Sequence, residues 1–169
     1  VPTDAYEQIA KITKQTGAQL VVDAEKDLVE PVLKYNPLFI KPNKDELEVM
    51  FDTTIKSDED VIIYAREILK MGAASVIVSL GGEGAVYVDH THNLKATVPN
   101  GKVVNTVGSG DSTVAGMVAG LEAGLSIEAS FKQAVSAGTA TAFNDDLATN
   151  KAIEAIKNQV TITTLNGSE

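Results

Sequence analysis

Apolar residues recur at two different spacings along this chain, and the two spacings predict helices and buried strands. Between residues 58 and 72, apolar side chains return every three or four positions, as at Val61, Ala65 and Ile68, which is typical of an amphipathic helix. Residues 75–80 are instead a short continuous apolar run, as in a strand that is buried on both faces. The pattern therefore indicates both kinds of element.

Helices and strands predicted in this way alternate along the whole sequence. Helices are expected at residues 6–17, 26–34, 58–72, 111–124, 127–144 and 151–158, with a short one after Asn43. Strands are expected at residues 18–23, 38–41, 75–80, 84–89, 94–98, 103–106 and 161–165. Buried strands that alternate with helices indicate an α/β domain with a largely parallel sheet. By its length of 169 residues, the chain is one such domain.

Polar or glycine-rich segments follow four of the expected strands. They begin at Asp23, Lys41, Ser79 and Gly108. Because ligands of open α/β sheets bind outside the carboxyl ends of the strands, we expect all four segments to face one edge of the sheet. This convergence is stronger evidence for a site than any one segment.

The segment from Val103 to Gly116 carries the clearest chemistry. It begins with β-branched residues, turns at Gly108 and Gly110, presents the carboxylate of Asp111 and continues as a helix. Glycines let the backbone approach a ligand, and the first N–H groups of a helix, together with its dipole, attract an anion. Asp111 would lie beside that anion and could accept a proton from a substrate hydroxyl, which suggests phosphoryl transfer.

A plain turn is the alternative interpretation of the same segment, with Asp111, Ser112 or Ser109 as the N-cap of the helix. The helix that follows is unusually rich in alanine and glycine. Small residues would let this helix lie close against a sheet or a nucleotide, which favours the functional interpretation.

Composition excludes several classes of partner. The chain has 14 basic and 23 acidic residues and a net charge of −9, which argues against nucleic acid or an anionic membrane surface as a partner. A phosphate ligand remains compatible, because a helix terminus can bind an anion locally. No segment reaches the roughly 20 apolar residues of a membrane span, and no signal peptide is evident. The sequence therefore predicts a soluble, cytoplasmic protein.

Cysteine and histidine add little chemistry. The absence of cysteine excludes a disulfide framework, a thiolate metal site and a cysteine nucleophile. His90 and His92 lie in a polar stretch that predicts an exposed hairpin turn, with a zinc pair as the less favoured alternative.

Three ordered segments resemble the ribokinase-like (PfkB) carbohydrate kinases. They are residues 41–47 (Lys-Pro-Asn-Lys-Asp-Glu-Leu), residues 76–85 (Val-Ile-Val-Ser-Leu-Gly-Gly-Glu-Gly-Ala) and residues 104–112 (Val-Asn-Thr-Val-Gly-Ser-Gly-Asp-Ser). The last segment is very specific to the family. The resemblance covers nearly the whole chain, but only roughly the carboxyl-terminal half of a family member. The Gly-x-x-x-x-Gly-Lys-Ser/Thr motif of P-loop kinases is absent, so the chain is not expected to be a P-loop kinase.

The resemblance implies a Rossmann-like three-layer α/β domain with a largely parallel central sheet. Residues 1–169 would be its nucleotide-binding, catalytic carboxyl-terminal part. In relatives the other half supplies a small β lid and most sugar-binding groups, so the lid and amino-terminal half are expected to be missing. A start at Val-Pro-Thr-Asp, without Met, agrees with a fragment. The isolated chain is expected to be inactive.

The implied reaction is ATP-dependent phosphorylation of a sugar phosphate. Fructose 1-phosphate, converted to fructose 1,6-bisphosphate, is the preferred substrate, and tagatose 6-phosphate is the alternative acceptor. For this chain alone, a nucleotide-binding module without turnover is the second alternative. The expected cofactors are ATP and Mg²⁺, and a homodimer of the full-length protein is left open.

The resemblance also assigns roles around the second glycine-rich turn. Asp111 aligns with the family's catalytic base. Gly108, Ser109 and Gly110 would hold the charge of the transferred phosphoryl group through backbone N–H groups. Helices that match residues 137–142 border the adenine in relatives, although the sequence does not identify a contacting side chain.

Further roles fall on the earlier segments. Asn43 and Glu46 match an Asn-x-x-Glu motif linked to Mg²⁺ and phosphate placement, with a capping box as the structural alternative. Lys41 would meet a donor phosphate, or else be an ordinary surface lysine. Asp23 would assist the metal region or, as the sequence favours, cap a turn.

The segment after the strand at residues 75–80 matches the loop that approaches the nucleotide. Its residues in that role would be Ser79, Gly81, Gly82 and Gly84. A glycine-rich string of this kind is more often a hairpin turn, which is the alternative.

Overall fold

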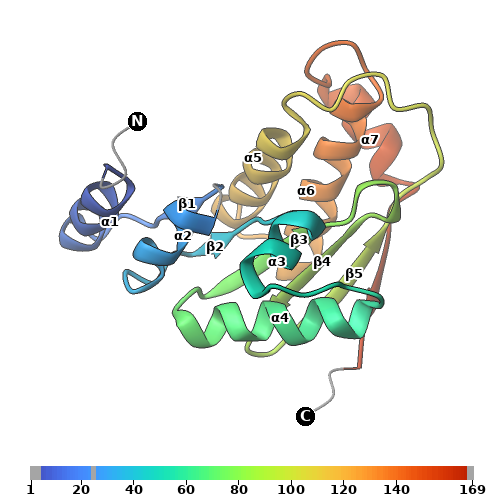
Figure 1. Ribbon diagram of the computed structural model, residues 1–169. Coiled ribbons are helices and arrows are strands. Elements are labelled where there is room, and N and C mark those ends of the chain that lie inside the picture. The colour runs from blue at the N-terminus through green and yellow to red at the C-terminus, as the bar shows by residue number, and fades with distance from the viewer. Residues whose placement is uncertain (1–4, 24–25, 167–169) are drawn as a thin grey trace. The chain divides into compact units, whose positions relative to one another are not determined.

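Helices and strands alternate along the chain, as the sequence predicts (Figure 1). The computed structural model describes residues 5–23 and 26–166. The backbone forms two compact units: one contains the residues up to Leu80 with Val86–Asn93 and Leu165, and the other contains Gly81–Ala85 and Leu94–Thr164.

The element order is that of an α/β protein. In chain order the elements are α1 (Ala5–Thr16), β1 (Val21–Val22), α2 (Lys26–Leu33), β2 (Phe39–Ile40), α3 (Lys44–Phe51), α4 (Asp58–Met71), β3 (Ser75–Ser79), the 3-10 turn η1 (Gly81–Glu83), β4 (Ala85–Asp89), β5 (Asn93–Thr97), α5 (Ser109–Glu122), α6 (Ile127–Ala142), α7 (Asn150–Lys157) and β6 (Thr161–Thr164).

The strands form a six-stranded sheet in the order β1-β2-β3-β4-β5-β6. The first three strands are parallel, with Val21 opposite Phe39 and Ile40 opposite Val76. The last two strands are antiparallel, with Leu94 opposite Thr164. Parallel pairing of successive strands through intervening helices confirms the predicted α/β class.

The core of the first unit is built from the apolar faces that the sequence pattern marks. Val61, Ala65 and Ile68 of α4 are buried, as are all but the last residue of β3. Helix α4 begins at the N-cap Ser57, whose hydroxyl accepts a hydrogen bond from the N–H of Asp60, and it ends at Gly72. The caps fix where the helix starts and stops, so its apolar face meets the core in register.

In the second unit, α5 packs directly against α6. Gly116 and Gly120 of α5 are the contact points: a methyl group on Gly116 would lie 2.8 Å from the Cα of Ala134, and one on Gly120 would lie 2.7 Å from the hydroxyl of Ser130. The small residues of α5 therefore serve helix–helix packing. At these two glycines the predicted sheet is replaced by a helix as the packing partner, and packing of α5 against a nucleotide stays a prediction.

The strand predicted at residues 103–106 is absent. The N–H groups of Val104 and Asn105 both donate to the carbonyl oxygen of Ala142, at 2.8 and 3.2 Å, so this extended segment pairs with the end of α6 instead of a strand. β-Branched residues favour extended backbone, but they do not determine its partner. Val103 and Val107 remain exposed.

Two smaller differences concern helix ends. Helix α5 begins at Ser109, two residues before the predicted start, and α6 ends at Ala142, short of the predicted residue 144. Within the described residues, no helix has the length and apolar character needed to span a bilayer.

Candidate active site

The turn that opens α5 is the centre of the candidate site. Gly108 is its N-cap, at φ 77° and ψ −5°, a left-handed conformation that favours glycine. The side chain of Asn105 accepts a hydrogen bond from the N–H of Val107 at 3.0 Å, and the N–H of Ser109 donates to the carbonyl of Thr106 at 3.2 Å. These bonds fold residues 105–109 into a tight turn that brings the backbone to the helix end.

Asp111 lies in the first turn of α5 and is exposed. Gly108 occupies the N-cap position and no side chain makes a capping hydrogen bond to the helix, so Asp111 is not the cap. Ser109 donates its hydroxyl hydrogen to the carbonyl of Gly138 at 2.9 Å, and Ser112 pairs with the hydroxyl of Thr141 at 2.9 Å. The alternative in which one of these three side chains caps the helix is therefore wrong.

The start of α5 also offers backbone donors. Across the described part of the chain, the N–H groups of Gly110 and Asp111 have no acceptor, whereas the N–H of Ser112 donates to the carbonyl of Gly108 at 2.9 Å. Two open N–H groups at the positive end of a helix attract an anion. With the Asp111 carboxylate beside them, the arrangement can bind an anionic group and accept a proton.

Helix α6 holds this first turn in place. Gly138 faces it so closely that a methyl group there would overlap the hydroxyl of Thr113 and lie 3.0 Å from the carbonyl oxygen of Ser109. Thr113 itself donates to that same carbonyl at 3.0 Å. The position of the first turn of α5 thus depends on the absence of a side chain at Gly138.

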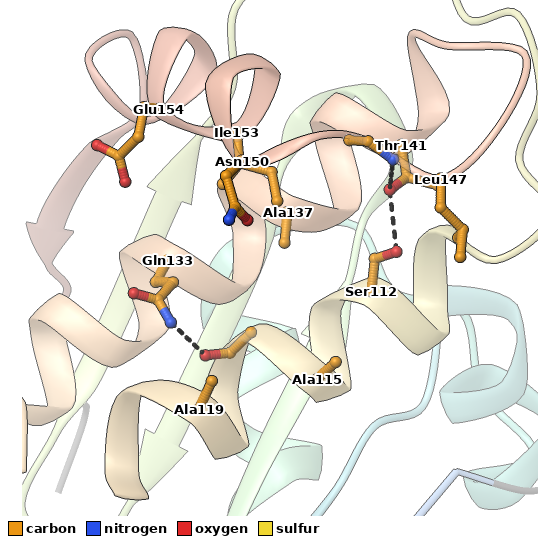
Figure 2. Close-up of a pocket in the computed structure, with 12 residues that line it drawn as sticks. Ser112, Ala115, Ala119, Gln133, Ala137, Thr141, Leu147, Asn150, Ile153 and Glu154 are labelled. Atoms are coloured by element: carbon orange, nitrogen blue, oxygen red, sulfur yellow. Dashed lines mark hydrogen bonds between the residues drawn. The ribbon is translucent and has the colours of Figure 1, made fainter. Parts of the chain in front are cut away.

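A pocket of about 410 Å³ lies among α5, α6 and α7 (Figure 2). Small or apolar side chains line much of it, among them Ala115, Ala119, Ala137 and Ile153. Ser112 and Thr141, which both line the pocket, are joined by a hydrogen bond, and the amide of Gln133 donates to the carbonyl of Gly116 at 3.1 Å.

The sequence indicates only part of this pocket. The predicted stretch 137–142 contributes Ala137 and Thr141, whereas no sequence motif marks α7. The amphipathic pattern of α7 was the signal for a buried face there, yet nothing in that pattern distinguishes a pocket wall from core.

The glycine-rich string after β3 forms the 3-10 turn η1. Gly81 and Gly82 are exposed, and a methyl group on either would meet open space. Gly84 is buried at φ 92°, and a methyl group there would overlap the carbonyl oxygen of Ala96 on β5. Gly84 is thus required by the packing of its own unit, whereas Gly81 and Gly82 leave their backbone accessible.

In the first unit, the ends of β1, β2 and β3 bring several predicted residues together. The N–H of Lys41 donates to the carbonyl of Val22 at 3.3 Å, and Asn43 pairs with Ser79 in a parallel bridge. The ammonium of Lys41 lies 3.3 Å from the carboxylate of Asp23, and the Lys41 side chain is 9% exposed. The surface-lysine alternative is therefore wrong. Residues 24 and 25, with which Asp23 would cap a turn, lie outside the described residues.

Asn43 and Glu46 form a complete capping box at the start of α3. The Asn43 side chain accepts from the N–H of Glu46 at 2.8 Å, and the Glu46 carboxylate accepts from the N–H of Asn43 at 2.8 Å. This confirms the structural alternative. A role in placing Mg²⁺ stays a prediction, which the capping box does not exclude because carboxylate and amide oxygens suit that ion.

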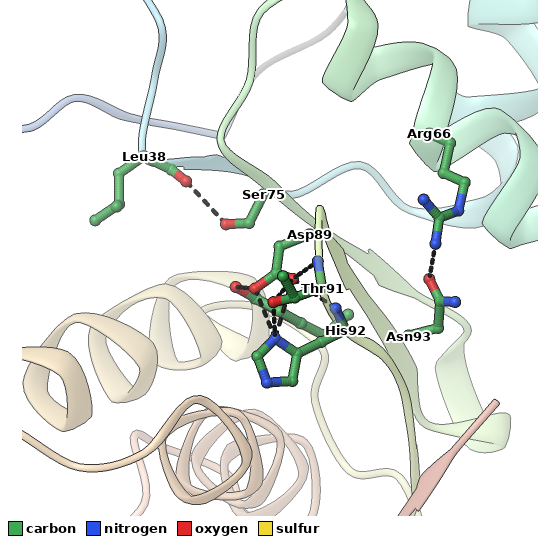
Figure 3. A network of polar contacts seen from close by, with 8 residues as sticks. Leu38, Arg66, Ser75, Asp89, Thr91, His92 and Asn93 are labelled. Carbon is green, nitrogen blue, oxygen red and sulfur yellow. Dashed lines mark hydrogen bonds and ion pairs between the residues drawn. The ribbon is translucent and has the colours of Figure 1, made fainter. Parts of the chain in front are cut away.

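The polar stretch around the two histidines is the turn between β4 and β5 (Figure 3). Asp89 accepts hydrogen bonds from the N–H groups of Thr91 and His92 at 2.7 and 2.6 Å and from the hydroxyl of Tyr87 at 3.0 Å. No cluster of three metal-binding side chains occurs in residues 5–23 or 26–166. The turn interpretation is confirmed.

Partial burial works against ionisation of Asp89, but the hydrogen bonds from Thr91, His92 and Tyr87 outweigh it and hold the pKa of this carboxyl below its ordinary value of 3.8. Burial, with the negative charge of Asp89 nearby, raises the pKa of Tyr87. Near neutral pH the Asp89 carboxyl is therefore ionised and the Tyr87 hydroxyl is protonated, which are the states that the hydrogen bonds of the turn require.

Each unit thus carries its own set of predicted residues. Asp23, Lys41, Asn43, Glu46 and Ser79 cluster in the first, and the turn at residues 108–111 stands in the second. That both sets serve one active site stays a prediction.

Comparison with known proteins identifies the family. The sequence pattern described as "pfkB family carbohydrate kinase" matches residues 1–154. The chain belongs to this family. Among curated pfkB relatives, the 1-phosphofructokinase of Bacillus subtilis is 39% identical over 98% of this chain and 54% of its own length, and the D-tagatose-1-phosphate kinase of Bacillus licheniformis is 36% identical over 98% and 55%.

Solved structures agree with that assignment. A Staphylococcus aureus structure described as a candidate phosphofructokinase is 69% identical, with a TM-score of 0.95 over 99% of this chain and 55% of the other. Phosphofructokinase-2 from Escherichia coli, in complex with substrates and products, is 30% identical with a TM-score of 0.83 over 90% and 52%. The chain spans about half the length of the pfkB relatives it matches.

Proposed function

We propose that the complete protein containing this chain transfers a phosphoryl group from ATP to a free hydroxyl of a sugar phosphate. The preferred acceptor is fructose 1-phosphate, which would become fructose 1,6-bisphosphate. The observation that carries the proposal is the exposed carboxylate of Asp111 beside the open N–H groups of the first turn of α5. Similarity to a 1-phosphofructokinase over nearly the whole chain supports the choice of acceptor.

The chemistry needs two things from this turn. The Asp111 carboxylate would accept the proton of the acceptor hydroxyl. At the same time, the oxygen of that hydroxyl forms a bond to the γ-phosphorus of ATP, and the bond between this phosphorus and ADP breaks. The open N–H groups of Gly110 and Asp111 and the positive end of α5 would stabilise the negative charge on the transferred group, whereas the N–H of Ser109 already donates to the carbonyl of Thr106. Gly108 would serve here by its left-handed conformation, which allows the turn that opens α5 at Ser109.

The first unit would contribute to the donor side. Lys41 would neutralise a donor phosphate. In the second unit, the exposed backbone at Gly81 and Gly82 would lie along the nucleotide. Asn43 and Glu46 would hold Mg²⁺ through water, and the ion when bound neutralises charge on the phosphates. Glu46 uses one carboxylate oxygen in the capping box, and no hydrogen bond to the other oxygen occurs within the described residues.

Tagatose phosphate is the second candidate acceptor. Tagatose-6-phosphate kinase of Staphylococcus epidermidis is 38% identical over 70% of this chain, which favours it. A kinase assay on the complete protein, with ATP, Mg²⁺ and each sugar phosphate in turn, distinguishes the two. We expect a higher kcat/KM for fructose 1-phosphate, and a higher value for tagatose 6-phosphate would reverse the assignment. No turnover with either would reject the kinase proposal.

For this chain alone we propose nucleotide binding without turnover, since it carries the family's donor-site motifs in a length about half that of its relatives. Titration of the chain with ATP and Mg²⁺ should give heat of binding, and added fructose 1-phosphate should yield no ADP. A homodimer of the complete protein is also proposed, and its mass in solution would test it.

A further inference from the structure

Lys41 is an unusually buried cation. Its side chain is 9% exposed, although lysine is seldom buried to this degree unless its charge is paired. Its ammonium lies 3.3 Å from the carboxylate of Asp23, whose own side chain is 34% exposed. Removing an ammonium from water is costly unless a partner compensates for the lost hydration. Asp23 is that partner among the described side chains.

The backbone of Lys41 is fixed on both sides. Its N–H donates to the carbonyl of Val22 at 3.3 Å, and the next residue, Pro42, accepts from the N–H of Ser79 at 3.0 Å. The Cα of Lys41 is thus held between the ends of β1 and β3. The freedom that remains lies in its flexible four-carbon side chain, which a lysine does not pre-organise by itself.

Asp23 restricts that remaining freedom. Lysine has three donor hydrogens, and one ion-pair partner leaves donors available for a second anion. The carboxylate is the more exposed partner of the pair, at 34% against 9% for the lysine side chain. The ion pair therefore holds the ammonium at the ends of β1 and β2 before the phosphate binds.

We propose that Asp23 is a positioning residue that holds the ammonium of Lys41 ready for a donor phosphate of the nucleotide. This inference rests on the proposed function, because it requires Lys41 to meet that phosphate. It assigns Asp23 no direct contact with a metal ion or with the substrate. Asp23 acts on the reaction only through Lys41.

The test is a double-mutant cycle in the complete protein. The variants are Asp23→Asn, Asp23→Glu, Lys41→Met and the double Asp23→Asn/Lys41→Met. The readouts are the Kd for ATP·Mg²⁺ by titration calorimetry, the kcat/KM for ATP, and the Tm. The matched control is Glu67→Gln, which removes the carboxylate from the exposed pair of Glu67 and Lys70, 2.6 Å apart in the same unit.

We expect Asp23→Asn to weaken ATP·Mg²⁺ binding by about tenfold, as a misplaced binding group does. Asp23→Glu should recover part of that loss, and Glu67→Gln should bind as the unchanged protein does. On the Lys41→Met background, Asp23→Asn should cause no further loss of ATP·Mg²⁺ affinity, because the lysine through which Asp23 acts has been removed. If Asp23→Asn alone fails to fold, the comparison of Lys41→Met with the double variant still shows whether Asp23 affects ATP binding without Lys41. The double variant can be measured because it leaves no unpaired buried charge.

Several outcomes overturn the inference. A full additional loss on the Lys41→Met background would show that Asp23 acts directly, for instance on the metal ion. Unchanged ATP affinity in Asp23→Asn or in Lys41→Met would remove the positioning role while leaving kinase activity intact. Failure of the proposed function looks different: the complete protein would bind ATP but phosphorylate neither sugar phosphate, and the affinity cycle could still be read. A complete protein that does not bind ATP would overturn both.

Discussion

At the level of single residues, local packing distinguishes the residues that the fold requires from those whose groups remain accessible for chemistry. Gly84 and Gly82 lie two residues apart, yet one is buried at φ 92° against the carbonyl of Ala96 and the other faces open space. Asp111 has the residue type of a helix cap, but Gly108 occupies the cap position. The carboxylate is therefore left available at the start of α5.

Gly84→Ala is predicted to lower the free energy of unfolding by roughly 2–4 kcal/mol, because a methyl group would meet left-handed backbone strain and overlap the Ala96 carbonyl at once. Gly82→Ala, the matched control in the same turn, should change it by less than about 0.5 kcal/mol. Urea unfolding of the two variants measures both values. Equal stability of the two variants would contradict this account.

At the scale of elements, the turn that opens α5 is positioned by the contact of α5 with α6. Gly116, Gly120 and Gly138 bring the two helices close enough for Ser109 and Ser112 to bond to α6. In the other unit, the capping box of Asn43 and Glu46 fixes where α3 begins. Helix ends in this chain thus set the positions of most candidate site residues.

Gly138→Ala is predicted to destabilise the protein by about 1–3 kcal/mol and to lower kcat, because the added methyl group would displace Thr113 and the first turn of α5. Thr113→Ala should restore part of both losses in the double variant, since it removes the hydroxyl that the methyl group overlaps. Thermal unfolding and a kinase assay on the complete protein provide the comparison. Absence of any rescue would mean that the displaced atoms have been misidentified.

Glu46→Gln separates the capping role from the metal role. Glutamine at this position preserves a capping box, so the Tm should stay near that of the unchanged protein. The lost charge should raise the Mg²⁺ concentration needed for half-maximal activity several-fold. Asn43→Ala, by comparison, should cost about 1 kcal/mol of stability. An unchanged Mg²⁺ requirement in Glu46→Gln would mean that Asn43 and Glu46 serve only to cap α3.

At the scale of the whole molecule, the sequence predicts the α/β class and nearly every element, because helical periodicity and buried apolar runs are local properties. It fails where the partner is remote: Val104 and Asn105 look like a strand but bond to Ala142. The glycine turn and Asp111 are recognisable from the sequence because glycine and a carboxylate at fixed spacing carry their chemistry in the residue types. The burial of Lys41 beside Asp23 cannot be recognised from the sequence, because it depends on which strands become neighbours in the sheet.

The pH dependence of global stability should include a contribution from Asp89. Its pKa in the folded protein lies below 3.8, so its contribution is fully present above about pH 5 and is lost as the pH falls through the lowered folded pKa. Asp89→Asn should therefore be less stable at pH 7 and should lose less stability on acidification. Unfolding by urea at pH 7, 5 and 3 tests this, with the exposed Asp145→Asn as control. Parallel pH profiles for Asp89→Asn and the unchanged protein would argue against the Asp89 network.

Asp111→Asn in the complete protein is the most direct measurement of the central claim. Removal of a general base should reduce kcat with fructose 1-phosphate by roughly 10²–10⁴-fold, while the Kd for ATP·Mg²⁺ stays nearly unchanged because the N–H groups of the turn remain. A variant that keeps the kcat of the unchanged protein would contradict the assignment of Asp111 as the base.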